Sequence, residues 1–361
     1  YGSYTPAVVV SPVAAQFGGY LNQLNSYEHA FHNMDMRMLM TRKERQAYKM
    51  ANRYASTVTP TVFSPTYLPE NDKGAWFRPY ATFEKVDLKN GPKVENISYG
   101  SYFGGDSPLY ELKRGWDYQY SVYAGYNGSH QNYSGNSIYQ NGGTLGATAI
   151  WYKDNFFTAL TANVSAGVAD ASTMYGSEDF PMLMTGVASK TGYNWELSKG
   201  RFIIQPSFLM SYSFVNTFDY TNAAGVRIKS DPLNAINIAP GLKFIGNLKN
   251  GWQPYIGMQM VWNIMDKTDF RANNVALPDL SVKPYFQYGV GIQKRWGERF
   301  TGFFQTMIKN GGRNGVALSL GFRWSLGGEK NKKADEHRIQ KSLKKTPVLK
   351  KTEITLNDSN A

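Results

Sequence analysis

The sequence contains no cysteine, and only 18% of its 361 residues are charged. Without cysteine, the chain can form neither a disulfide framework nor a cysteine-based metal site. Its four histidines leave little for a histidine-built metal centre, so we expect no metal and no other cofactor. The chain also lacks an apolar run of about 18 residues, which argues against a transmembrane helix.

The chain opens at Tyr1 instead of a methionine, and it lacks the basic and then apolar segments of a signal peptide. We therefore expect it to be a processed product or the end of a longer precursor.

Aromatic residues and glycine are abundant, with 25 tyrosines, 20 phenylalanines, 8 tryptophans and 35 glycines. An ordinary globular domain has about 25% charged residues and about 7% glycine. Low charge combined with many aromatic residues is typical of a transmembrane β-barrel, in which only every second strand residue meets lipid.

Residues 71–326 alternate between apolar and polar side chains. In 316–326 the even positions hold Val, Leu, Leu, Phe, Trp and Leu, and the odd positions hold Ala, Ser, Gly, Arg and Ser. A period of two places the two sets on opposite faces of a strand. The pattern predicts twelve strands, at 75–88, 97–110, 116–128, 140–152, 156–169, 184–197, 201–216, 234–247, 252–265, 281–296, 299–309 and 315–326.

The predicted connections alternate in length. Short turns follow every second strand, with the sequences ELKRG, KDN, LSKG, KNG and GER. Long segments follow the first, third, fifth, seventh and ninth strands, among them 129–139, 170–183, 217–233 and 266–280. This asymmetry, with an even strand number, predicts an all-β fold: a closed 12-stranded antiparallel barrel in the bacterial outer membrane. A soluble β-sandwich or propeller would explain the alternation but not the asymmetry.

The two faces of the strands predict two sets of residues. Polar residues of the inward parity are predicted to line the pore: Arg78, Asp117, Gln119, Gln205, Lys243, Gln259, Gln287 and Arg323. The tryptophans are predicted to form an aromatic girdle against phospholipid and lipopolysaccharide at the membrane interfaces: Trp76, Trp116, Trp151, Trp195, Trp252, Trp262, Trp296 and Trp324.

Residues 1–70 are predicted to hold a helix at about 15–40 and then an extended connector with three prolines in 56–70. A helix is about 10–12 Å across, so we expect it to plug the pore; packing elsewhere is the alternative. The predicted pore-helix residues include Phe17, Leu24, Phe31, Met34, Asp35 and Arg37. Their apolar face is expected to pack on inward glycines: Gly125, Gly257, Gly289 and Gly291.

Residues 327–361 are polar and basic and contain no aromatic residue. The composition predicts a disordered tail, or one bound to an anionic or protein partner. We expect no nucleic-acid partner, because the positive charge is spread over turns, lumen and tail with no nucleic-acid-binding signature.

Three stretches resemble the translocator (β) domain of autotransporters, the type V secretion proteins of Gram-negative bacteria. AAQFGGYLNQLNSYEHAFHNMDMRM (14–38) is similar to the family's pore helix. YSVYAGYNGSHQNYSG and NGGTLGATAIWYKDNFFTALTANVSAG, within 120–167, resemble its third and fourth strands, and GVALSLGFRWSL (315–326) resembles its closing strand. The resemblance implies a barrel that anchors a passenger segment and supports its export and surface display, with the barrel assembly machinery as a partner. It also places the tail and short turns in the periplasm and the long loops outside the cell.

The resemblance has two departures. Family members usually end at the last strand, whereas this chain runs 35 residues beyond Leu326. Residues 1–14 are also too few for a β-helical passenger. A porin-like or structural outer-membrane protein is the alternative function, and it would leave the pore open.

We predict no enzymatic activity. His130 with Ser129, Ser134 and Asn136 superficially suggests a membrane-embedded hydrolase, but this stretch has a turn composition. Some autotransporters cleave themselves within the pore helix at asparagine. No Asn-Asn pair is present among Asn22, Asn25 and Asn33, so we do not predict self-cleavage.

Overall fold

The computed structural model describes residues 10–38, 41–46, 49, 73–89, 91, 93–133, 135–173, 175–248, 251–265, 269–272, 275–276, 281–296 and 299–326. The predicted connector and tail lie outside the described residues. In the N-terminal helix, side chains are described for residues 15–32, so those of Met34, Asp35 and Arg37 also lie outside them. Among the described residues, no helix is both long and apolar enough to cross a membrane.

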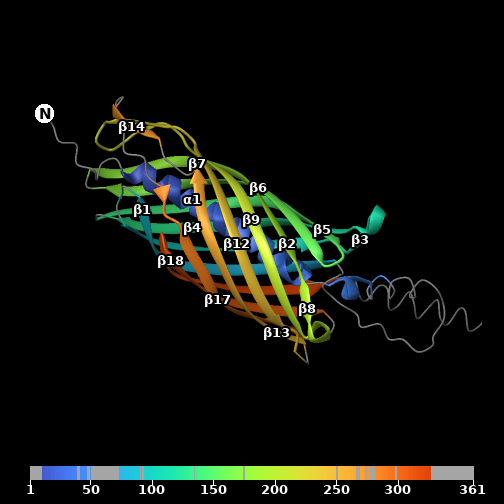
Figure 1. The fold of residues 1–361 in the computed structure, drawn as a ribbon. Coiled ribbons are helices and arrows are strands. Elements are labelled where there is room, and N and C mark those ends of the chain that lie inside the picture. Colours follow the sequence, from blue (N-terminus) through green and yellow to red (C-terminus); the bar gives the residue numbers. More distant parts are fainter. Residues whose placement is uncertain are drawn as a thin grey trace, which may run out of the picture.

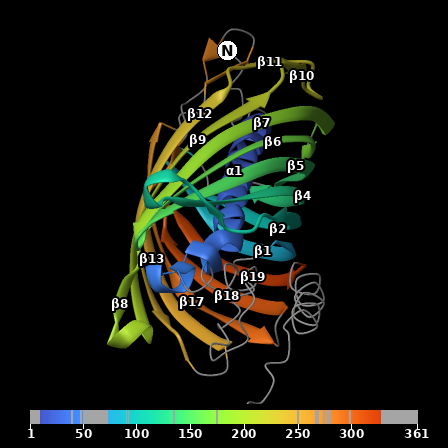
Figure 2. The same cartoon turned by 90° about the vertical axis from the view of Figure 1, so that its right-hand side faces the viewer.

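Twelve long antiparallel strands form a closed barrel (Figures 1 and 2), which confirms the predicted all-β fold. Each pairs with the next of the twelve, and β19 pairs with β1 to close the ring. The strands are β1 (Gly74–Lys89), β2 (Lys93–Asp106), β4 (Asp117–Tyr133), β5 (Asn136–Lys153), β6 (Phe156–Thr173), β7 (Gly176–Tyr193), β9 (Phe202–Thr217), β12 (Leu233–Gly246), β13 (Trp252–Met265), β17 (Tyr285–Trp296), β18 (Phe300–Gly311) and β19 (Arg313–Ser325).

The two faces of the barrel differ as the alternation requires. Large apolar side chains such as Val122, Leu145 and Ile256 are exposed on the outside, where they meet lipid. Glutamine, serine, threonine and asparagine side chains are buried on the inside. Because lipid offers no hydrogen bonds, the closed ring is needed to pair every backbone polar group of the spanning strands.

The predicted long loops after the first, third and fifth strands are wrong. The structure joins β1 to β2 through 90–92, β4 to β5 through 134–135 and β6 to β7 through 174–175. The strands simply continue, and β5, β6 and β7 each have 18 residues. About 9–11 residues suffice to cross a membrane, so these hairpins project beyond it. Outside the lipid their polar residues no longer need to alternate, and their composition therefore resembles that of a loop.

Two connections at the same end are long, as predicted. They contain β10 (Tyr220–Thr221), β11 (Arg227–Ser230), β14 (Phe270–Ala272) and β15 (Val275–Ala276), which form a separate four-stranded sheet. They also contain β16 (Ser281–Val282), which pairs with β1. The opposite end carries shorter turns, two of which hold the small strands β3 (Tyr110–Glu111) and β8 (Trp195–Leu197) and a 3₁₀ turn each, η3 (Lys113–Gly115) and η4 (Ser198–Gly200).

Helix α1 (Val10–Met38) runs through the barrel (Figure 2) and packs against β4, β5, β6, β7 and β9. Gly18 and Gly19 lie within it although glycine disfavours helix. A Cβ atom on Gly19 would lie 2.7 Å from Met182 Cε and 2.9 Å from Met184 Sδ. The glycine pair therefore permits the helix to approach the wall closely.

Candidate functional site: the occupied pore

The first part of α1 is held in the pore by apolar packing. Phe17, Tyr20 and Leu21 are buried in a cluster with Met182 and other wall residues. Further along, Tyr27 and Phe31 are buried against residues of β5 and β6. Leu24 is half-buried and packs on both clusters. The apolar spacing read from the sequence thus corresponds to the face of α1 that contacts the wall.

Tyr27 fixes the rotation of the helix. Its hydroxyl donates to the Tyr212 carbonyl oxygen at 3.0 Å and lies 2.9 Å from Ser213 Oγ. Its ring passes over Gly186, where a Cβ atom would lie 2.7 Å from Tyr27 Cζ. Glycine at this position leaves the space that the tyrosine occupies.

The expected packing of α1 on Gly125, Gly257, Gly289 and Gly291 is wrong. Gly125 lies under the ring of Tyr102, and Gly291 lies under the ring of Tyr255, which are inward tyrosines of neighbouring strands. Gly289 is closest to the β18 backbone. A Cβ atom on Gly257 would lie 3.9 Å from Lys243 Cε. Gly125 and Gly291 thus accommodate wall tyrosines, a pairing that the sequence pattern does not distinguish from helix packing.

Polar contacts join the middle of α1 to the wall. Ser26 Oγ lies 2.6 Å from the Tyr102 hydroxyl, and the His29 ring lies 4.3 Å from the Tyr80 ring, centroid to centroid. Glu28 accepts a hydrogen bond from Gln287 Nε2 at 3.0 Å. These contacts provide partners for some of the polar groups that α1 and the inner face of the barrel bury against each other.

Buried ion pairs hold the wall itself. Arg313 donates to both carboxylate oxygens of Glu84, at 2.6 and 2.7 Å, and Asn96 Nδ2 donates to the same carboxylate at 2.9 Å. Arg323 Nε donates to Asp106 at 3.0 Å. Sequence reasoning missed Glu84 and Arg313. Glu84 shares the inward parity of Arg78 and could have been found, whereas Arg313 lies before the predicted start of its strand.

A cavity of about 110 Å³ lies beside α1. It is lined by Glu28 and His32 of the helix and by residues of β12, β13 and β17. Three predicted pore-lining residues meet there: Lys243, Gln259 and Gln287. The other predicted pore-lining residues are buried on the inner face: Arg78, Asp117, Gln119, Gln205 and Arg323. Arg78 lies over the Phe303 ring, 4.4 Å from its centroid.

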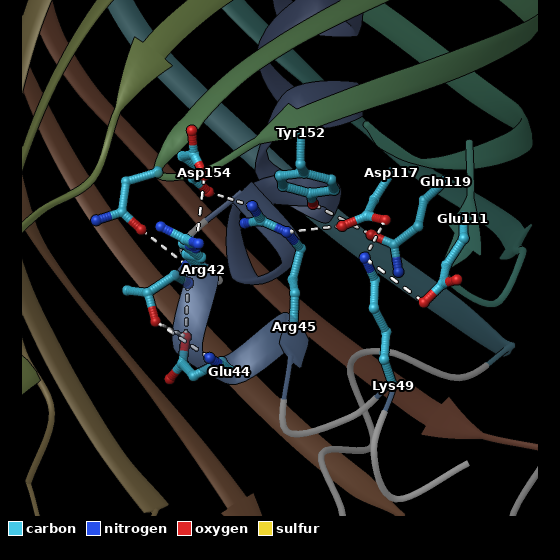
Figure 3. A network of polar contacts seen from close by, with 11 residues as sticks. Arg42, Glu44, Arg45, Lys49, Glu111, Asp117, Gln119, Tyr152 and Asp154 are labelled. Carbon is cyan, nitrogen blue, oxygen red and sulfur yellow. Dashed lines mark hydrogen bonds and ion pairs between the residues drawn. The ribbon is translucent and has the colours of Figure 1, made fainter. Parts of the chain in front are cut away.

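A helical turn over residues 42–46 closes the end of the pore at which the short turns lie (Figure 3). Thr41 and Glu44 form a capping box, in which the Thr41 backbone N–H donates to Glu44 Oε2 at 2.8 Å. The Arg42 backbone N–H donates to Asn155 Oδ1 at 2.7 Å. The turn is therefore attached to the connection between β5 and β6.

Asp117 is the centre of this closure. It pairs with Arg45 Nε at 3.3 Å and with Lys49 Nζ at 2.5 Å, and the Arg45 and Asp117 side chains are 3% and 4% exposed. The guanidinium lies over Tyr152, 4.8 Å from the ring centroid, and also donates to the Asp154 carbonyl oxygen. Burial lowers the pKa of Arg45 from its usual value, an effect that Tyr152 and Asp117 partly offset. Sequence reasoning predicted Asp117 but missed Arg45 and Lys49, since nothing in their spacing identifies the partner.

Replacing Asp117 with Asn should loosen this closure. The charged hydrogen bonds lost are worth about 1.5–3 kcal/mol, so the open form should become about ten- to a hundredfold more populated. Because the chain has no cysteine, Gln119→Cys places a single thiol behind Arg45 for maleimide labelling. D117N should raise the labelling rate. D154N is the matched control, because the Arg42–Asp154 pair is exposed and worth little. Equal effects of both would contradict a closure centred on Asp117.

The predicted girdle tryptophans lie on the outer surface, with one exception. Trp252, Trp262 and Trp324 are exposed, and Trp116 and Trp151 are half-buried. Trp76 is only 3% exposed, because it points into the barrel and its Nε1 donates to Ser121 Oγ at 3.3 Å. Trp76 has the same parity as Arg78, so both side chains lie on the inner face of β1. The prediction was wrong because it relied on the position of Trp76 at a strand end rather than on its parity.

The residues that suggested a hydrolase do not come together as a catalytic group. His130 lies in β4 and stacks on Tyr139, with ring centroids 4.1 Å apart. The neighbouring Ser129 is fully buried on the opposite, inner face, and Ser134 lies outside the described residues. Within the described part of the chain, no three His, Asp or Glu side chains gather as a potential metal site.

Comparisons with known proteins agree with this architecture. The autotransporter beta-domain family model matches residues 75–306. No curated protein matches the sequence significantly.

Among solved structures, the transport unit of AIDA-I from Escherichia coli is 15% identical with a TM-score of 0.62, and the match covers 80% of this chain and 100% of that one. The β domain of Bordetella BrkA is 17% identical with a TM-score of 0.58, covering 70% and 99%. The translocator domain of NalP from Neisseria meningitidis is 10% identical with a TM-score of 0.57, covering 83% and 98%. With a family model that spans most of the barrel, the chain belongs to the autotransporter β-domain family.

Proposed function

We propose that this outer-membrane translocator barrel exports a passenger segment that precedes α1 and displays it on the cell surface, while α1 remains in the pore and seals it. The observation that carries the proposal is the path of the chain. α1 begins at the end with the long hairpins, where Gln16 Nε2 donates to the Asp231 carbonyl oxygen at 3.1 Å. It runs to the opposite end, where β1 begins (Figure 1). A segment attached before Val10 would therefore leave at the hairpin end.

The same path supports an orientation. The hairpin end would face the cell exterior and the short turns would face the periplasm. The last strand ends beside the start of the first, since Ser325 pairs with Gly74. The tail would consequently start in the periplasm, where the barrel assembly machinery would meet the closing strand. A porin-like function needs an open lumen, and no observation favours it while α1 occupies the barrel.

A reporter domain fused before Tyr1, behind a signal peptide, tests export. We expect external protease to remove the reporter from intact cells. An epitope tag in the 134–135 turn should be accessible from outside, and the same tag in the 247–251 turn should not. A reporter that stays protected while the 134–135 tag is accessible would refute export, and the reverse tag pattern would refute the orientation.

A further inference from the structure

We propose that the short-turn end of the barrel binds anionic phospholipid at two outward sites, each built from a lysine and tryptophan. The first site is Lys294 with Trp252 and Trp296, and the second is Lys153 with Trp116. The leaflet assignment, but not the binding chemistry, rests on the orientation proposed above.

Lys294 is a lipid-facing lysine held between aromatic rings. It belongs to the outward parity of β17 and is the register partner of Trp252 on β13. Its Nζ lies 4.2 Å from the Trp252 ring centroid and 5.5 Å from that of Trp296. Among the described residues no carboxylate forms an ion pair with it, so its charge is oriented by cation–π contacts and remains available to a phosphate.

Lys153 repeats this arrangement elsewhere on the circumference. It ends β5, is exposed, and its Nζ lies 5.6 Å from the Trp116 ring centroid. Trp116 in turn contacts Phe156 edge to face, with centroids 6.4 Å apart. Within the described part of the chain Lys153 too has no carboxylate partner. Both sites thus combine a lysine charge with rings that can lie at the headgroup level.

Three turns at this end share a related sequence that supports the same partner. ELKRGW (111–116), ELSKGR (196–201) and NLKNGW (247–252) each contain a leucine followed within two positions by a lysine. All three leucines are exposed: Leu112, Leu197 and Leu248. Apolar side chains next to Lys and Arg suit the boundary between acyl chains and anionic headgroups. A purely ionic partner would leave the leucines and tryptophans without a role.

The hairpin end has a different chemistry. Two of its outward tyrosines pair with neutral asparagines: the Tyr126 hydroxyl donates to Asn141 Oδ1 at 2.6 Å, and Asn310 Nδ2 donates to the Tyr288 hydroxyl at 2.8 Å. Lys85 there is paired with Glu95 at 3.6 Å. In the part of the chain that the structure describes, the lysine–tryptophan combination is found at the short-turn end, where charge complementarity favours an anionic lipid.

The test is native mass spectrometry of the purified full chain in detergent, titrated with phosphatidylglycerol or phosphatidylcholine. One basic residue near a membrane surface contributes about fivefold to anionic-lipid binding. K153Q/K294Q removes one lysine from each site, so it should lower the phosphatidylglycerol affinity of each site by about fivefold and leave phosphatidylcholine binding unchanged. The matched control is K85Q/K93Q, which removes two lysines of the hairpin end and should change neither.

Three outcomes would overturn the proposal: equal binding of the two lipids by the unaltered chain, an equal loss in the control, or displacement of the lipid by inorganic phosphate alone. Far-ultraviolet circular dichroism and unchanged phosphatidylcholine binding verify that the variants fold. Because the assay uses purified protein, it succeeds or fails independently of passenger export.

Discussion

Removing residues 1–55 is expected to raise the single-channel conductance of the barrel in planar bilayers by about tenfold, because a helix about 10–12 Å across leaves the lumen. In the intact chain, α1 packs on β4, β5, β6, β7 and β9. Ions are then left with the space beside the helix, and the cavity there measures about 110 Å³. The wall should survive the deletion, since its strands pair with one another around the whole ring.

The matched control for this deletion is a chain that lacks only residues 1–9. It retains α1 and should conduct as poorly as the intact protein. If the intact chain already conducted as well as the chain lacking 1–55, α1 would not be a plug and the porin-like alternative would be favoured.

Replacing Glu84 with Gln is expected to lower the free energy of unfolding by about 3–5 kcal/mol. The Glu84 and Arg313 side chains are 0% and 1% exposed, so the neutral amide would leave the guanidinium buried without its counter-charge. Lys309 is buried close by and would add to the uncompensated positive charge. Urea unfolding of the barrel refolded into lipid vesicles, followed by tryptophan fluorescence, measures the loss.

Two variants make this experiment specific. K85Q alters the neighbouring residue, which faces outward in an exposed pair with Glu95, and should cost less than about 1 kcal/mol. The double variant E84M/R313M removes both charges together and should regain much of the loss in E84Q. If E84Q and K85Q were equally stable, the buried pair would not stabilise the wall.

The alternation of apolar and polar residues predicted those features of the fold that depend on each strand separately. It identified the twelve strands and the inner face that carries Gln119 and Gln205, because each residue's face follows from its own parity. Contacts between strands were not predictable in the same way. Gln119 contacts Tyr152, and Gly125 faces Tyr102, only because β2, β4 and β5 pair in one register. Register depends on the whole sheet rather than on the alternation within one strand.

The closure of the pore shows a second limit. Arg45 contacts Asp117 across 72 positions of sequence. The sequence around either residue does not identify the other as its partner. The hairpin lengths failed for a different reason, because the backbone pairing that continues β4 and β5 beyond the membrane needs no apolar alternation.

The two buried ion pairs of the wall have a consequence for assembly. Glu84 and Arg313 join β1 to β19, and Asp106 and Arg323 join β2 to β19 near the other end of the last strand. The partners are 229 and 217 positions apart, so they meet only when the final strand arrives. An ion pair therefore lies near each end of β19, and its charged groups remain hydrated until the last strand pairs with the first and closes the barrel. Closure of the barrel is the step that removes water from these charged groups. Mutations in either ion pair should therefore slow the last step of folding rather than the first.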